Sequence, residues 1–149
     1  MTTYLAVAAL GVALVQAAAA TTFPSLTTIY VMSGARDDGG GIATSIACTN
    51  VSGLTAGMRF LVLHSDGSVA GVFTSNLLHG RTVVVSTHET MHFIEGGYIA
   101  GGVLQGAINV ESTQSAVFCS GAIVDADATP EFSFPLHAVR VNPHPGTVE

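Results

Sequence analysis

Residues 58–75, MRFLVLHSDGSVAGVFTS, form two apolar runs on either side of Asp66-Gly67. Asp and Gly both tolerate positive φ, so this dipeptide between apolar runs predicts a β-hairpin with strands over 58–65 and 69–75. Residues 58–63 are apolar on both faces apart from Arg59, which is typical of a central strand covered on both sides. The hairpin therefore predicts a sheet with this strand in its interior.

Short apolar runs between turn residues continue in both directions from the hairpin. The other predicted strands cover 27–33, Ile42–Asn50, 81–87, Val103–Ser112, 115–126 and 136–142. Turns every 8–12 residues favour an antiparallel sandwich or barrel, and we find no helical pattern of the length that a parallel α/β fold would need. We expect an all-β protein, an antiparallel β-sandwich of about 7–9 strands over residues 21–142.

The two cysteines lie on two of these predicted strands. Alternation places Cys48 on the face of Ile42 and Ile46, and Cys119 on the face of Val117. Both thiols then point to the core, which predicts one disulfide, with a pair of buried free thiols as the alternative. The spacing suggests an immunoglobulin-like arrangement, but the chain has no Trp and Val117 occupies the position of the tyrosine corner, so only the sandwich class is assigned.

The N-terminus has the features of a signal peptide. Residues 5–20, LAVAALGVALVQAAAA, carry no charge and end in small residues, which predicts a signal peptide over 1–20. Sixteen residues are fewer than the roughly 20 that a transmembrane helix needs. The n-region lacks Lys and Arg, so an Ala-rich first helix is the alternative. We expect an exported protein, periplasmic or extracellular, with a loose tail over 143–149 and no membrane span in the mature chain.

The charge of the chain excludes some partners. Of its 149 residues, 48% are hydrophobic and 9% are charged, against roughly 25% charged in typical proteins. It has no Lys, four Arg and a net charge of −6. Binding to nucleic acid or to an anionic membrane needs a basic surface, so neither is expected.

Residues 88–92, HETMH, match the zinc-peptidase pattern H-E-x-x-H. On a helix His88 and His92 share one face and can bind one Zn²⁺, with Glu89 as general base on the metal-bound water. The S-x-x-E spacing of Ser86 and Glu89 is that of a capping box, which favours a short helix ending before Gly96-Gly97.

A third zinc ligand is hard to find. The extended motif fails, and Glu111, at a usable distance of 19 residues beyond His92, falls on the polar face of a predicted strand. A chain that is predicted to be all-β also lacks the helices that support a zincin site. The motif therefore gives only an alternative function.

Weaker candidate sites have ordinary structural alternatives. His64, His79, His88 and His92 fall within 29 residues and could share Zn²⁺ or Cu²⁺ if the hairpin gathers their loops, but separate surface histidines are favoured. The pairs Asp37-Asp38 and Asp125-x-Asp127 could supply Ca²⁺ ligands, although turn formation explains them better. Arg59 and Arg140 should pair with carboxylates at sheet edges. Asn50-Val51-Ser52 is a glycosylation sequon.

The runs IACTNVSG, HGRTVVVSTH, ESTQSAVFC and LHAVRVNPHPGT resemble a group of small exported bacterial β-rich proteins without an assigned activity. The resemblance covers nearly the whole mature chain. It implies a signal peptide and a small β-rich domain, and it implies no catalytic residues.

We therefore expect a non-catalytic exported structural, surface or binding module that needs no cofactor. The sequence does not identify its ligand, and a protein and a glycan are the two partner classes considered. The alternative is a small zinc-dependent hydrolase that uses His88, Glu89 and His92, with Glu111 as the third ligand.

Overall fold

A computed structural model describes residues 25–90, 93–99, 102–127 and 133–141, and these residues contain ten strands and no helix. The predicted signal peptide and the C-terminal tail lie outside these ranges. No helix in the described residues could cross a membrane. The strands are β1 (Thr27–Asp37), β2 (Ile42–Asn50), β3 (Ala56–His64), β4 (Val69–Leu77), β5 (Thr82–Ser86), β6 (Gly97–Tyr98), β7 (Val103–Ser112), β8 (Val117–Asp125), β9 (Ser133–Pro135) and β10 (Ala138–Arg140).

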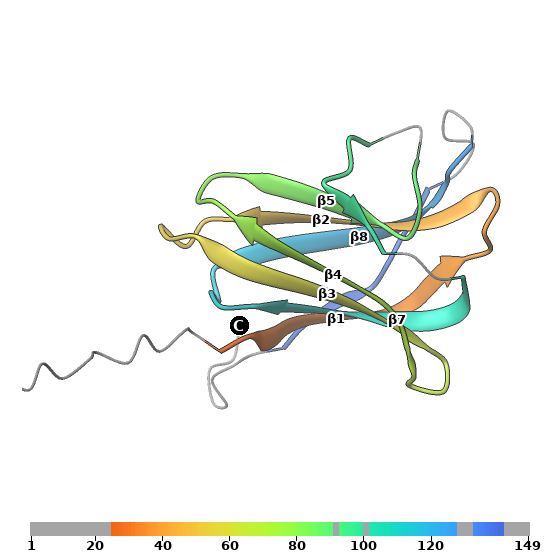
Figure 1. Cartoon of the computed structure of the whole chain (residues 1–149), viewed down its shortest axis with the longest axis horizontal. Helices are drawn as coiled ribbons and strands as arrows, with labels where there is room; N and C mark the ends of the chain where they lie inside the picture. The colour runs from red at the N-terminus through yellow and green to blue at the C-terminus, as the bar shows by residue number, and fades with distance from the viewer. Residues whose placement is uncertain (1–24, 91–92, 100–101, 128–132, 142–149) are drawn as a thin grey trace, which may run out of the picture.

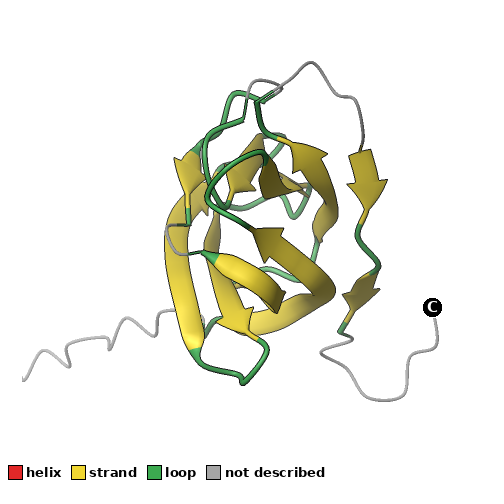
Figure 2. Cartoon of the chain, turned by 90° about the vertical axis from the view of Figure 1, so that its right-hand side faces the viewer, coloured by secondary structure: helices red, strands yellow, loops and turns green. Residues whose placement is uncertain are grey.

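The strands form two five-stranded sheets, which confirms the predicted all-β sandwich (Figure 1). Sheet A has the order β10-β1-β7-β3-β4, and sheet B has the order β6-β5-β2-β8-β9. All neighbouring pairs are antiparallel except β5 and β6. Figure 2 looks along the strands and shows the two sheets enclosing the space between them.

One apolar core fills that space. Met32, Phe60 and Val110 from sheet A and Ile46 and Val85 from sheet B are almost completely buried in it. Each side chain follows the strand alternation that the sequence showed, and burial of such a side chain contributes roughly 1.5–3 kcal/mol. The core is therefore what holds the two sheets together.

The β3–β4 hairpin turns where the sequence predicted. Gly67 has φ of 83°, and its N–H donates to the carbonyl oxygen of His64 over 3.0 Å. Asp66 Oδ1 accepts bonds from the Ser68 N–H and hydroxyl at 2.9 and 2.6 Å, and these bonds hold the pKa of Asp66 below its ordinary value. Asp66 therefore supplies the side-chain acceptor that this turn requires, and Gly67 supplies the positive φ.

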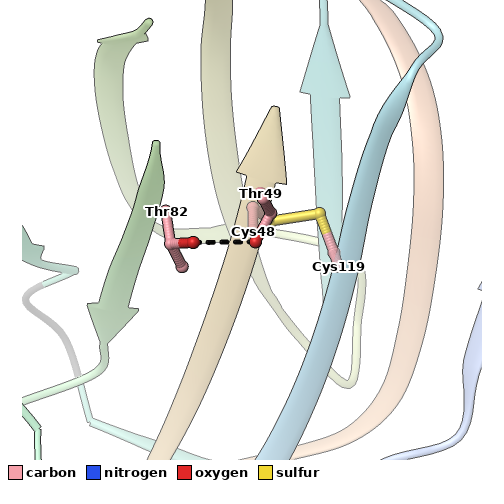
Figure 3. The surroundings of a disulfide bond; sticks show 4 residues. All are labelled: Cys48, Thr49, Thr82 and Cys119. Carbon is pink, nitrogen blue, oxygen red and sulfur yellow. Dashed lines mark hydrogen bonds between the residues drawn. A yellow bond between two sulfur atoms is a disulfide. The ribbon is translucent and has the colours of Figure 1, made fainter. Parts of the chain in front are cut away.

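The predicted disulfide joins Cys48 on β2 to Cys119 on β8 (Figure 3). The two residues are direct partners in the antiparallel register, with Cα atoms 4.1 Å apart. The bond therefore links neighbouring strands of sheet B. The immunoglobulin disulfide instead connects the two sheets, so this chain does not have it.

Asn50 ties the two sheets together at the end of β2. It is fully buried, and its Nδ2 donates to the carbonyl oxygens of Leu54 and of Leu77 on β4, both over 2.7 Å. Its Oδ1 accepts from the Ser52 N–H. Both the nitrogen and the oxygen of the Asn50 side-chain amide, the sequon asparagine, are thus hydrogen-bonded inside the folded protein.

The structure departs from the predicted strands at two places. In the last predicted strand only β10 pairs with sheet A, while β9 precedes it in sheet B, because the chain crosses between the sheets at Leu136, which packs on the core. Alternation along the strand would put Leu104 on the buried face of Ile108. It is 77% exposed, because register shifts between β1 and β7 put Val103 into the core instead.

Candidate functional site

The HETMH segment begins in an irregular loop that follows β5. The helix that the zinc-site alternative requires is absent from residues 86–90 and 93–97. Ser86 is the last residue of β5 rather than a helix cap, and its hydroxyl bonds to the Ser45 hydroxyl over 2.7 Å. His92 lies outside the described residues, so the predicted pair of imidazoles is described only at His88.

Glu95 holds this loop in place. Its Oε1 accepts bonds from the Thr90 N–H at 3.1 Å, from the Thr90 hydroxyl at 2.5 Å and from the Ser86 hydroxyl at 3.3 Å. Partial burial, and then the nearby charges of Glu89 and Glu95, raise the pKa of the Tyr98 phenol. The loop is thus fixed by a carboxylate that no motif had marked.

His88 pairs with a buried aspartate from the β1–β2 turn. His88 Nδ1 lies 3.0 Å from Asp37 Oδ1, and the Asp37 side chain is only 5% exposed. The Gly39 N–H donates to the same oxygen over 2.8 Å. His88 Nε2 is buried and makes no hydrogen bond with the residues that the structure describes. The arrangement orients the imidazole in the way that a carboxylate orients a metal-binding histidine.

A surface depression of about 540 Å³ adjoins this pair. It is lined by Gly39, Gly40, His88, Glu89, Thr90, Ala126 and Asp127. Asp38 Oδ1 accepts from the Gly40 and Ile42 N–H groups, which lower the pKa of Asp38, and Asp125 Oδ1 accepts from the Asp127 N–H. The Asp38 and Asp125 side chains therefore accept hydrogen bonds from backbone N–H groups of their own turns. Within the described ranges no three His, Cys, Asp or Glu side chains are grouped to hold a metal ion.

Glu111 is not near the histidine loop. It pairs with Arg59 on the outer surface of sheet A, and this bond raises the pKa of Arg59. The β7 residue beside Asp37 is Val103, and the eight residue steps from Val103 to Glu111 span about 26 Å of strand. Glu111 as a third ligand beside His88 is therefore wrong, while the predicted carboxylate partner of Arg59 is confirmed.

The other histidines do not gather either. His64 ends β3, whereas His79 follows β4 and its Nδ1 accepts from the Gly53 N–H over 3.1 Å. Because Ala56 at the start of β3 faces Leu77 at the end of β4, His64 and His79 lie at opposite ends of the hairpin. The hairpin does not bring their loops together. His137 and Arg140 lie at the other edge of the sheet, where the Arg140 guanidinium is 5.0 Å from the Phe118 ring centroid.

The outer surface of sheet A is an exposed apolar surface, which we call face A. It carries Val31, Leu61, Leu63, Val69, Val72, Ala107, Asn109 and Val139, bordered by Thr28, Ser33, Arg59, Thr74 and Glu111. One cross-strand row runs through all five strands in the order Val139, Val31, Asn109, Leu61 and Val72. Val72 is 50% exposed and Val139 is 51% exposed.

Face A was visible in the sequence but was misinterpreted. Residues 58–63 are apolar on both faces, and this pattern predicted a central strand covered on both sides. The structure places β3 next to last in sheet A, with Phe60 in the core and Leu61 on face A. The second apolar side of β3 is thus available for contact with another molecule.

Comparisons with known proteins found no matching family model, no matching curated protein and no matching solved structure.

Proposed function

We propose that the protein is a non-catalytic, exported surface or binding module that holds its partner on face A. The observation that carries this proposal is the row from Val139 to Val72, in which four of five side chains are apolar and the two end members are half exposed. Apolar surface that remains on a folded domain is costly to keep in water, and a contiguous patch marks a contact site.

Export is supported by two features that lie in different parts of the chain. The Cys48–Cys119 disulfide persists in oxidising compartments and is rare in the cytosol. The uncharged segment 5–20 has the length and small-residue ending of a signal peptide. We expect the exported protein to begin at Thr21, which mass measurement of the exported protein would show. An exported chain that retains residues 1–20, or a cytosolic one, would contradict this part of the proposal.

Partner binding is tested with a photo-reactive amino acid at position 72 or 51 of the exported chain. Val51 is the matched control, because it is 47% exposed against 50% for Val72 but lies in the loop after β2. We expect a covalent adduct from position 72 and a much weaker one from position 51. Equal yields from both positions, or no adduct from position 72, would contradict a binding role for face A.

The zinc hydrolase remains a second candidate because of one observation, the pairing of His88 with Asp37 and the buried Nε2 that makes no hydrogen bond. Zinc bound through Nε2 would use Asp37 as the carboxylate that orients the ring. The expected result is about one zinc per chain in the purified protein, lost in His88→Ala and retained in His79→Ala. Protein that binds no zinc, or that binds it equally in both variants, would remove this candidate.

A further inference from the structure

We infer that the occupant of face A is a second copy of this chain, packed face to face as a two-fold symmetric dimer. The inference rests on the proposed function, because it names the partner for the same surface. Three features of face A favour a second copy over an unrelated protein: the symmetry of its central row, its charge and its size.

The central row is nearly symmetric about β7. Asn109 lies on β7, in the middle of sheet A, with two apolar residues on either side. A two-fold axis along β7 places Val31 of one copy against Leu61 of the other, and Val139 against Val72. Apolar side chains therefore meet apolar side chains along the whole row, as an isologous interface requires.

Asn109 favours a second copy of this chain as the partner of face A. It is the only polar residue of the row, and an amide buried without a partner costs about 1–3 kcal/mol. On the two-fold axis it faces a second Asn109, and each amide can donate its N–H to the carbonyl oxygen of the other. An apolar partner surface would leave both groups of the amide unsatisfied.

Face A carries no unbalanced charge. Its two charged side chains, Arg59 and Glu111, neutralise each other within each copy. Because Glu111 lies on β7 like Asn109, the two-fold axis places the Arg59–Glu111 pair of one copy against that of the other, at one border of the surface. The net charge of −6 would oppose association if it were spread over this surface. Asp37, Asp38, Asp125 and Asp127 instead lie at the ends of β1 and β8, around the β1–β2 turn. Two copies can therefore approach through face A.

The size of face A suits a weak dimer. Four strands contribute three outward positions each and β10 contributes one, and a spacing of about 4.8 Å by 7 Å per position gives a flat area of roughly 440 Å² per copy. The two copies would bury roughly 900 Å², slightly below the area of about 1,000 Å² that marks a stable specific interface. We therefore expect a dissociation constant on the order of micromolar.

The test is sedimentation of the full chain over a series of concentrations. We expect the wild-type protein to pass from monomer to dimer as its concentration rises. Asn109→Asp places two carboxylates against each other, and Val72→Lys places an ammonium group against Val139 of the other copy, so each should weaken association at least tenfold. Val51→Lys is the matched control, with the same substitution at similar exposure, and it should sediment as wild type.

Each outcome is decisive for the dimer. A wild-type chain that stays monomeric, or association that persists in both face A variants, overturns it. Association through the apolar segment 1–20 would give the second result. Thermal unfolding checks that at least one of the two variants is folded, which is expected because both side chains are partly exposed.

The photo-reactive residue at position 72 separates this inference from the proposed function. An adduct of twice the chain mass supports the dimer. An adduct with a different protein, from a chain that is monomeric in sedimentation, overturns the dimer and leaves face A as a binding surface. No adduct at all removes both.

Discussion

The outer surfaces of the two sheets differ in chemistry although the sheets have the same number of strands. Face A presents Val and Leu along its central row. The corresponding surface of sheet B, which we call face B, presents small and hydroxyl side chains. Face B consists of Ser45, Ala47, Thr49, Thr82, Val84, Ser86, Phe118, Ser120 and Ala122.

Face B satisfies its own polar groups. The Ser45 and Ser86 hydroxyls bond across the strands at 2.7 Å, and those of Thr49 and Thr82 do so at 2.8 Å, the pair shown in Figure 3. The loop held by Glu95 covers the Ser86 end of this surface, where Ser45 and Ser86 are buried. The Ser86 end of sheet B is thus covered by its own chain, although Phe118 on face B is 52% exposed. The difference teaches that the two sheets treat their outer sides differently: face B pairs hydroxyl groups beneath a loop, and face A presents aliphatic side chains along its central row.

The strongest way to break the comparison is to remove the covalent link in sheet B. Replacing Cys48 and Cys119 together by Ala should lower the free energy of unfolding by about 4 kcal/mol, because the disulfide closes a loop of about 70 residues in the unfolded chain. Chemical denaturation measures this loss. Reductant should have a similar effect on the wild-type protein and none on the double variant. A loss under about 1 kcal/mol would mean that packing alone holds β2 to β8.

A second variant tests the connection between the sheets. Asn50→Ala removes the donors to the Leu54 and Leu77 carbonyl oxygens and leaves both without these bonds. The expected loss is about 3 kcal/mol, since each buried group left unsatisfied costs about 1–3 kcal/mol. Asn76→Ala, at an exposed position of β4, is the control and should change the stability little. Equal losses in the two variants would contradict a special role for Asn50.

Uncovering face B should have a smaller effect. Glu95→Ala removes the acceptor of three hydrogen bonds, and we expect a loss of about 1–2 kcal/mol together with faster hydrogen exchange at the Thr90 amide. Glu89→Ala changes an exposed carboxylate of the same loop and should leave this exchange unchanged. Unchanged exchange in the Glu95 variant would show that the loop covers face B without it.

The smallest expected effect is a pH dependence at the turn that joins the two sheets. Backbone N–H groups of Gly40 and Ile42 lower the pKa of Asp38 below its ordinary value of 3.8. A lowered pKa stabilises the folded protein above 3.8, and the contribution is lost as the pH falls through the folded value. Asp38→Asn should therefore lower the melting temperature slightly at pH 7, and the difference should disappear in strong acid. A difference that persists there would assign it to another cause. Asp66→Asn makes the same comparison within sheet A.

Local patterns in the sequence predicted much of the fold. Alternation placed Cys48 and Cys119 toward the core, and Asp66-Gly67 marked the hairpin, because both signals depend only on neighbouring residues. The helix that the zinc alternative requires over HETMH rested on equally local signals, and it is absent from the described residues of the segment. Ser86 does bond to a glutamate, but the glutamate is Glu95, and pairing with Ser45, 41 residues away, fixes Ser86 in a strand.

The candidate sites depend on contacts that no local pattern shows. Asp37 meets His88 across 51 residues of sequence, so neither residue could be assigned to the other beforehand. Face A depends on the register of five strands and on the position of β3 within its sheet. The two-sided apolar pattern of residues 58–63 was the available signal, and it indicated that both sides of β3 are apolar without locating the outer side on the surface of the sheet.

The position of the disulfide also makes its formation depend on the correct alignment of β2 and β8 during folding. Cys48 and Cys119 face each other directly, so a slip of one residue between β2 and β8 would turn one thiol to the opposite side of the sheet. A slip of two residues would displace one Cα by about 7 Å along the strand and separate the pair by about 8 Å, beyond the reach of a disulfide. The disulfide can therefore form only when β2 and β8 pair in the native register. Chains in which the two strands are shifted keep both thiols free.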